Sequence, residues 1–108
     1  YNFTAATGVN LLPETVARLA THPNIVGMKE SGSDIAQIAD LVAVANPSFS
    51  VLAGSASTFQ AALSAGVSGG ILALAAVFPE ACVRLFELMR ADYPRYRQIM
   101  QKAEIKVE

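Results

Sequence analysis

The chain has 108 residues, of which 53% are hydrophobic and 16% are charged, and its net charge is −1. This length is sufficient for one small domain, and the high hydrophobicity excludes an intrinsically disordered segment. The sequence has no basic patch, and its longest apolar stretch without charge, residues 69–78, is too short to span a bilayer, so we expect neither nucleic acid nor a membrane as a partner. One cysteine and one histidine exclude a disulfide framework and metal sites that need several of either residue.

Helical patterns alternate with strand-like runs along the chain. The strand-like runs are short, apolar and bounded by turn residues, and they cover residues 24–31, 49–54 and 70–75. The helical patterns cover residues 13–21, 34–45 and 58–65, and two further helices are expected to begin at Pro79 and at Pro94. The predicted order of elements is therefore α-β-α-β-α-β-α-α.

Local signals predict where the helices begin and end. Ser33 is the expected N-cap of the second helix and Ser57 that of the third, which should stop at Gly66. His22 lies in a turn before the first strand, and Cys82 lies in the apolar stripe of a later helix. We interpret them as a surface residue and a core residue respectively.

The alternation of strands and helices predicts parallel β/α units with strands buried on both faces. Three strands cannot close a barrel, and an open parallel sheet of three strands would leave long edges unpaired. A (β/α)8 barrel needs roughly 200 residues or more. We therefore expect residues 1–108 to be one partial barrel domain, about half of a barrel, whose N-terminal half is missing.

One lysine stands inside a predicted strand. Strand side chains alternate, so Lys29 shares a face with Gly27 and Ser31, whereas Glu30 points to the opposite face, where we interpret it as a charge at the helix-facing rim. Inside a barrel, burial would lower the pKa of Lys29 and free its amine for attack on a carbonyl. The carboxyl end of a strand is also where barrel enzymes place their chemistry. The alternative is a lysine that reaches solvent or pairs with a carboxylate.

Several short motifs together resemble a known family. In chain order they are Tyr1-Asn2, Thr7-Gly8, the Gly-Met-Lys-Glu run within residues 22–32, and residues 52–56. This combination is similar to the dihydrodipicolinate synthase / N-acetylneuraminate lyase family of class I, pyruvate-dependent aldolases. The resemblance covers nearly the whole chain. It implies the C-terminal half of a (β/α)8 barrel, from the end of strand five through helix eight into the C-terminal helices.

The resemblance also implies roles for single residues. Lys29 would form the imine with pyruvate or another 2-oxo acid, and the Tyr1 hydroxyl would carry protons during imine formation and carbon–carbon chemistry. The residues expected to line the pyruvate pocket or to shape its mouth are Gly54, Ile71 (through its backbone), Thr7 and Gly8. No metal and no organic cofactor are expected.

Departures from the family's patterns guide the choice of reaction. The synthase branch carries an arginine where this chain has Ala6, and acidic residues where it has Ser55-Ala56. Residues 22–34 and 51–56 are most similar to 4-hydroxy-2-oxoglutarate aldolases, and 2-oxo-sugar-acid aldolases can carry alanine at position 6. The resemblance therefore implies a Schiff-base aldolase or lyase of one of these two types. One alternative is 4-hydroxy-tetrahydrodipicolinate synthase, which condenses pyruvate with aspartate semialdehyde. Another is a catalytically inactive half-barrel that self-associates.

Two parts of the family's active site lie in the first half of the barrel: the threonine pair that holds the pyruvate carboxylate, and a tyrosine supplied by a neighbouring subunit. The resemblance therefore implies that the full-length protein is the enzyme, as a homodimer or homotetramer, and that residues 1–108 alone are inactive. The sequence shows no signal peptide, so we expect a cytoplasmic location.

Overall fold

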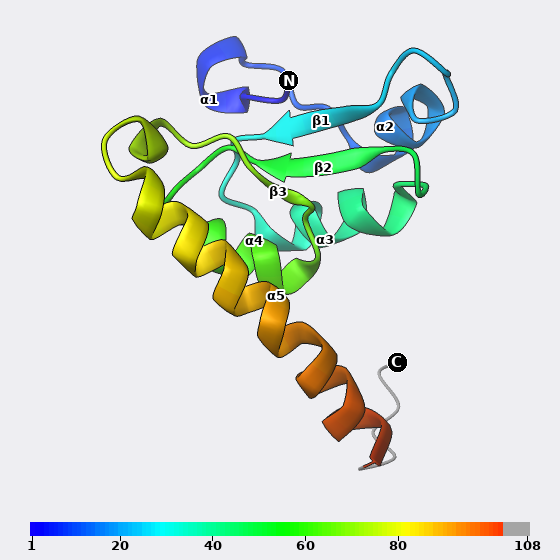
Figure 1. Cartoon of the computed structure of the whole chain (residues 1–108). Helices are drawn as coiled ribbons and strands as arrows, with labels where there is room; N and C mark the ends of the chain where they lie inside the picture. The colour runs from blue at the N-terminus through cyan, green and yellow to red at the C-terminus, as the bar shows by residue number, and fades with distance from the viewer. Residues whose placement is uncertain (103–108) are drawn as a thin grey trace.

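A three-stranded parallel sheet forms the centre of the computed structural model, which describes residues 1–102. Its strands lie side by side in chain order and are β1 (Gly27–Glu30), β2 (Ser50–Ala53) and β3 (Gly69–Gly70) (Figure 1). The register places Lys29 beside Leu52, and Leu52 beside Gly69. The predicted parallel α/β arrangement is therefore confirmed.

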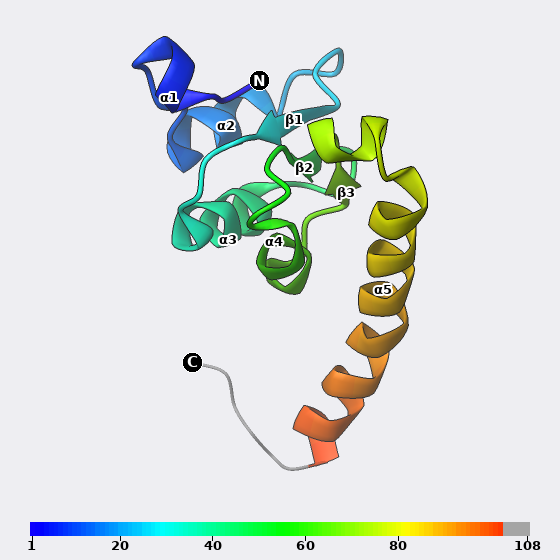
Figure 2. The same ribbon diagram turned by 90° about the vertical axis from the view of Figure 1, so that its left-hand side faces the viewer.

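The helices connect these strands and pack against one another in sequence. They are α1 (Thr4–Thr7), α2 (Pro13–Leu19), α3 (Ile35–Val44), α4 (Phe59–Ala65), the 3₁₀ helix η1 (Ala73–Ala76) and α5 (Pro79–Lys102). Helix α2 contacts α3, α3 contacts α4, and α4 contacts both β2 and α5. Figures 1 and 2 show α3 and α4 beneath the sheet, whereas α5 extends away from it.

The two faces of the sheet differ in burial. Met28, Val51 and Ala53 point into the helix-facing core and are buried, whereas Lys29 and Leu52 on the other face are half-buried. Within residues 1–102 the helices cover one face only, so the burial expected on both faces of the strands is observed on the helix-facing side alone. The other face, which carries Lys29 and Leu52, is the open face of the sheet.

The third strand is much shorter than the predicted run over residues 70–75. Its last ladder bond is donated by the backbone N–H of Ile71 to the carbonyl of Ala53 (2.8 Å). Leu72 then turns into the core with 8% of its surface exposed, and the alanine-rich residues after it form η1. Alanine favours helical backbone over strand, so the apolar run continues as a helical turn.

The predicted boundary at Pro94 is also wrong, because α5 continues through this residue. Proline lacks the N–H that would bond to the carbonyl four residues earlier, which weakens a helix at that point. The surrounding residues include many strong helix formers, such as arginine, alanine, methionine and glutamine, and these favour continuation.

Two of the three cap predictions need correction. Asp34, and not Ser33, caps α3, because its carboxylate accepts a hydrogen bond from the backbone N–H of Gln37 (3.1 Å). Thr58, and not Ser57, is the N-cap residue of α4. Gly66 ends α4 as predicted, in the left-handed conformation (φ 101°) that glycine adopts without steric cost. Within the described residues, no helix has both the length and the apolar character needed to cross a membrane.

Candidate active site

Lys29 is the penultimate residue of β1, lies on the open face of the sheet, and is half-buried. Its Nζ atom lies 4.4 Å from the centroid of the Tyr1 ring. At this distance the amine is in contact with the negative face of the aromatic ring. The structure therefore brings together the two residues for which the resemblance implies catalytic roles, and those roles stay predictions.

A short extended segment at the start of the chain places Tyr1. The backbone N–H of Asn2 donates to the carbonyl of Lys29 (2.9 Å), and the N–H of Ser31 donates to the carbonyl of Asn2 (3.0 Å). These bonds make a parallel bridge in which Asn2 pairs with Glu30 at the edge of the sheet. Because Tyr1 precedes this bridge, its side chain lies over the carboxyl end of β1.

Ser31 is a further member of this site, although no role was predicted for it from the sequence. Its hydroxyl donates a hydrogen bond to the Tyr1 hydroxyl (3.2 Å). This bond is the main reason why the pKa of Tyr1 lies below its usual range; the nearby Lys29 amine adds to the effect, and desolvation opposes it. The side-chain alternation that places Ser31 on the same face as Lys29 was the available signal.

Gly54 follows β2 and leaves the space that this cluster needs. A Cβ atom at this position would collide with Ser31 Oγ and would lie 2.7 Å from Lys29 Cε. Gly54 is not one of the glycines with positive φ, so the requirement is for space and not for an unusual backbone. The structure therefore places Gly54 beside Lys29 for a steric reason, and its predicted role in lining a pyruvate pocket stays a prediction.

The remaining predicted pocket residues have weaker links to Lys29. The side chain of Ile71 is 53% exposed, and its N–H is used in the bond to Ala53, so only its carbonyl could serve a substrate. Thr7 and Gly8 end α1, with Gly8 in a left-handed conformation (φ 71°). The hydroxyl of Thr7 bonds to the carbonyls of Phe3 and Val9, so its hydrogen bonds stay within its own turn.

Glu30 differs most from its predicted place. It points to the helix-facing side as expected, but its side chain is only 2% exposed and is not a charge at the rim. Its carboxylate accepts hydrogen bonds from Asn2 Nδ2 (2.6 Å), from the N–H of Gly32 (2.6 Å) and from Gln37 Nε2 (3.4 Å). These amide donors compensate for the loss of water around the buried carboxylate.

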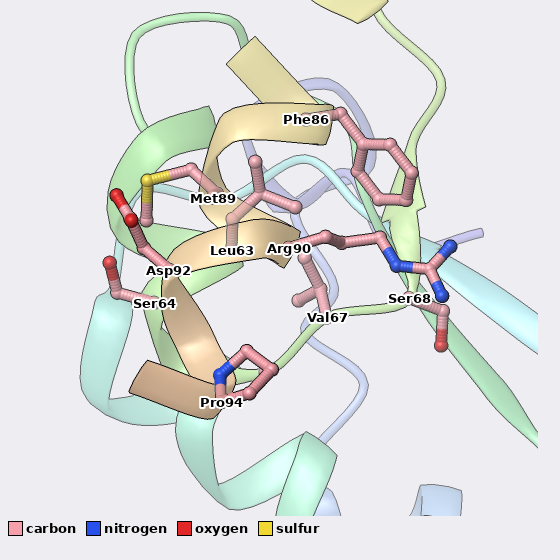
Figure 3. Close-up of a pocket in the computed structure, with 10 residues that line it drawn as sticks. Leu63, Ser64, Val67, Ser68, Phe86, Met89, Arg90, Asp92 and Pro94 are labelled. Carbon is pink, nitrogen blue, oxygen red and sulfur yellow. The ribbon is translucent and has the colours of Figure 1, made fainter. Parts of the chain in front are cut away.

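A large cavity lies elsewhere in the molecule, between α4 and α5 (Figure 3). Its volume is about 870 Å³, and its wall includes Leu63, Phe86 and Met89 together with Arg90. Neither Lys29 nor Tyr1 contributes to it. In the described part of the chain, no group of three histidine, cysteine or acidic side chains is placed to hold a metal ion.

Comparison with known proteins shows the family to which the chain belongs. Residues 1–104 match the model of the dihydrodipicolinate synthetase family, and the chain belongs to that family. The chain is 38% identical over 103 residues to the 4-hydroxy-tetrahydrodipicolinate synthase of Leptospira biflexa, and 44% identical over 90 residues to that of Xanthomonas axonopodis pv. citri. These matches cover 94% and 83% of this chain but only 35% and 30% of the two relatives.

Solved structures give the same result. The dihydrodipicolinate synthase of Aquifex aeolicus matches with a TM-score of 0.80 and 30% identity over 96% of this chain and 36% of that one. The synthase of Thermotoga maritima matches with a TM-score of 0.73 and 33% identity over 100% of this chain and 41% of that one. The chain thus spans about a third of the length of the curated relatives, and the resemblance found in the motifs is confirmed.

Proposed function

We propose that these residues are the carboxyl-terminal part of a (β/α)8 barrel and supply the nucleophile of a pyruvate-dependent, Schiff-base lyase. Three observations support this: the parallel βα units, the open face of the sheet, and the matches to about a third of larger proteins. The observation that carries the proposal is the position of Lys29 Nζ, 4.4 Å from the Tyr1 ring at the carboxyl end of β1.

The chemistry begins with attack of the Lys29 amine on the 2-oxo carbon of pyruvate. A carbon–nitrogen bond forms, the former carbonyl oxygen takes up protons and leaves as water, and a protonated imine remains. This cation accepts the electron pair left when a proton is removed from C3, which gives an enamine. The enamine carbon then attacks the aldehyde of the second substrate, and the reverse sequence cleaves the same bond.

Tyr1 is suited to the proton transfers in this sequence. A phenol with an ordinary pKa of about 10 holds its proton too firmly to act readily as a base at neutral pH. Here the hydrogen bond from Ser31 lowers the pKa of Tyr1, and the Lys29 amine lies against the same ring. The Tyr1 hydroxyl therefore gives up its proton more easily than an ordinary phenol, at the place where the imine would form.

Among reactions of this type, the synthase reaction is the best supported. The curated relatives described above are named 4-hydroxy-tetrahydrodipicolinate synthase, which favours pyruvate and aspartate semialdehyde over the 4-hydroxy-2-oxoglutarate expected from the sequence. Ala6, where the synthase branch carries an arginine, is exposed in α1 and remains the departure that argues against this assignment.

A substrate panel tests this choice in the full-length protein. We expect consumption of pyruvate in the presence of aspartate semialdehyde, no cleavage of 4-hydroxy-2-oxoglutarate, and loss of the activity in Lys29→Arg. Cleavage of 4-hydroxy-2-oxoglutarate without turnover of the semialdehyde would reverse the assignment. An unchanged rate in Lys29→Arg would remove Lys29 from the mechanism.

A further inference from the structure

The buried carboxylate of Glu30 has no part in the chemistry described above. With its side chain 2% exposed, it is among the largest fully buried side chains of the described residues. Both of its oxygens accept hydrogen bonds, and all three donors are neutral amides: Asn2, Gly32 and Gln37. Burying a carboxylate costs free energy unless hydrogen bonds compensate for the lost water. The groups that donate to Glu30 therefore indicate its role.

Of the two side chains that donate to Glu30, Asn2 is closer than Gln37, and Asn2 is itself only 1% exposed. The Asn2 side chain also donates to Asn10 (2.8 Å) and accepts a bond from the N–H of Leu11 (3.0 Å). Its backbone bonds to both Lys29 and Ser31. Both the backbone and the side chain of Asn2 are therefore held by hydrogen bonds, and the bond to Glu30 connects Asn2 to the buried face of β1.

Tyr1 is less buried than Asn2, with 65% of its surface exposed. Among the described residues its ring stacks on Phe3, with the ring centroids 6.0 Å apart, and contacts Ser31 and Lys29. The backbone of the next residue, Asn2, is therefore one fixed point for the position of the ring. Lys29 and Glu30 are neighbours on opposite faces of β1. On one face the Lys29 amine contacts the Tyr1 ring, and on the other the Glu30 carboxylate bonds to Asn2, the residue after Tyr1.

We propose that Glu30 is a positioning residue, whose bond to Asn2 holds the Tyr1 hydroxyl within reach of Ser31 and Lys29. The inference rests on the function proposed above and adds a residue outside the reacting groups. Loss of the bond would leave Lys29 in place and would allow the Tyr1 ring to move. A displacement of about 1 Å at a catalytic group can reduce a rate by about 10²-fold.

The test uses two variants and one control in the full-length protein. Glu30→Gln keeps the size of the side chain but replaces one acceptor oxygen by an NH₂ group, which faces the Asn2 NH₂. The double variant Asn2→Asp/Glu30→Gln exchanges donor and acceptor and restores the bond, because the new carboxylate accepts from the new amide. The side-chain amides of Asn10 and Gln37, which bond to Asn2, Glu30 and each other, must turn over to match the exchange. Glu14→Gln makes the same substitution at an exposed position in α2 and is the matched control.

Two readouts separate positioning from catalysis. The first is the division between kcat and KM: we expect Glu30→Gln to lower kcat by about 10²-fold with little change in the KM for pyruvate. The second is the titration of Tyr1 by NMR of ¹³C-labelled tyrosine, assigned with Tyr1→Phe. This readout needs no substrate, and we expect Glu30→Gln to move the titration to higher pH, because the contacts with Ser31 and Lys29 are lost.

The inference is supported if Glu30→Gln lowers kcat and moves the Tyr1 titration to higher pH, and if the double variant restores both values. Glu14→Gln should change neither value. The inference is overturned if Glu30→Gln leaves the Tyr1 titration in place, or if the double variant has a normal melting curve but recovers neither property. If Tyr1 responds as expected but the unaltered protein forms no imine, the proposed function fails while the anchoring of Tyr1 stands.

Discussion

At the scale of single residues, the carboxyl ends of β1 and β2 bring Lys29 together with Tyr1, Ser31 and Gly54. Lys29 stood out as a charged side chain within an apolar strand, and the motif around it carried the resemblance. The contact of Gly54 with Lys29 could not be predicted, because it depends on the register between β1 and β2. Alternation placed Ser31 on the face of Lys29, but its bond to Tyr1 depends on the bridge between Asn2 and Glu30. The burial of Glu30 depends on Asn2, which is distant in the sequence.

The hydrogen bond from Ser31 leads to a prediction about pH. A donor to the phenol oxygen stabilises the deprotonated form, so Ser31→Ala should raise the pKa of Tyr1. We expect the ¹³C tyrosine titration of Tyr1 to move to higher pH. Ser64→Ala, which removes an exposed hydroxyl in α4, should leave it unchanged. An identical Tyr1 titration in Ser31→Ala would show that the bond has no effect.

The space left by Gly54 leads to a steric prediction. In Gly54→Ala the new methyl group meets Ser31 Oγ and Lys29 Cε, so the amine must move. We expect the rate of imine formation with pyruvate to fall by about 10²-fold, measured by stopped-flow or by timed trapping. In Gly69→Ala the methyl group would make only an ordinary contact, 3.7 Å from Leu52, and should be tolerated. Equal rates in the two variants would contradict the steric explanation.

At the scale of elements, periodicity and turn residues predicted the alternation of strands and helices but not every boundary. Residues 70–75 look like one apolar run, yet the ladder ends at Ile71 and the alanines turn into η1. A run of this kind satisfies both strand and helix patterns, and tertiary packing decides between them. Pro94 is a strong local stop signal, but α5 continues through it.

The N-cap of α3 gives the prediction that belongs to this scale. Asp34 accepts a bond from the backbone of Gln37, whose side chain reaches Glu30. Loss of an N-cap acceptor typically costs about 1 kcal/mol, so we expect Asp34→Ala to lower the free energy of unfolding by about that amount. Ser33→Ala should have a smaller effect. Urea unfolding measures both, and a larger loss for Ser33→Ala would contradict the assigned cap.

At the scale of the whole molecule, the sequence predicted that these residues form part of a larger parallel α/β arrangement. The structure adds the asymmetry between the two faces of the sheet, with the core on the helix side and Lys29 on the open face. What lies over the open face could not be derived from these residues, because strand alternation reports which side chains share a face and not what covers them.

Exposed apolar side chains give a prediction about the isolated chain. They include Val26, Ile71, Val77 and Phe78, each more than half exposed. Apolar surface of this kind favours association. We expect residues 1–108 alone to self-associate in sedimentation velocity and to form no imine, whereas the full-length protein forms a defined homo-oligomer that does. A stable monomer of the isolated chain with full imine formation would contradict the half-barrel proposal.

The amine of Lys29 is tested most directly by trapping. The full-length protein is incubated with pyruvate and borohydride, digested and analysed by peptide mass spectrometry, with Lys29→Arg and a sample without borohydride as controls. We predict a reduced pyruvyl adduct on Lys29 in the unaltered protein and none in either control. An unmodified Lys29, or an adduct on Lys102 or Lys106 in its place, would contradict the proposed mechanism.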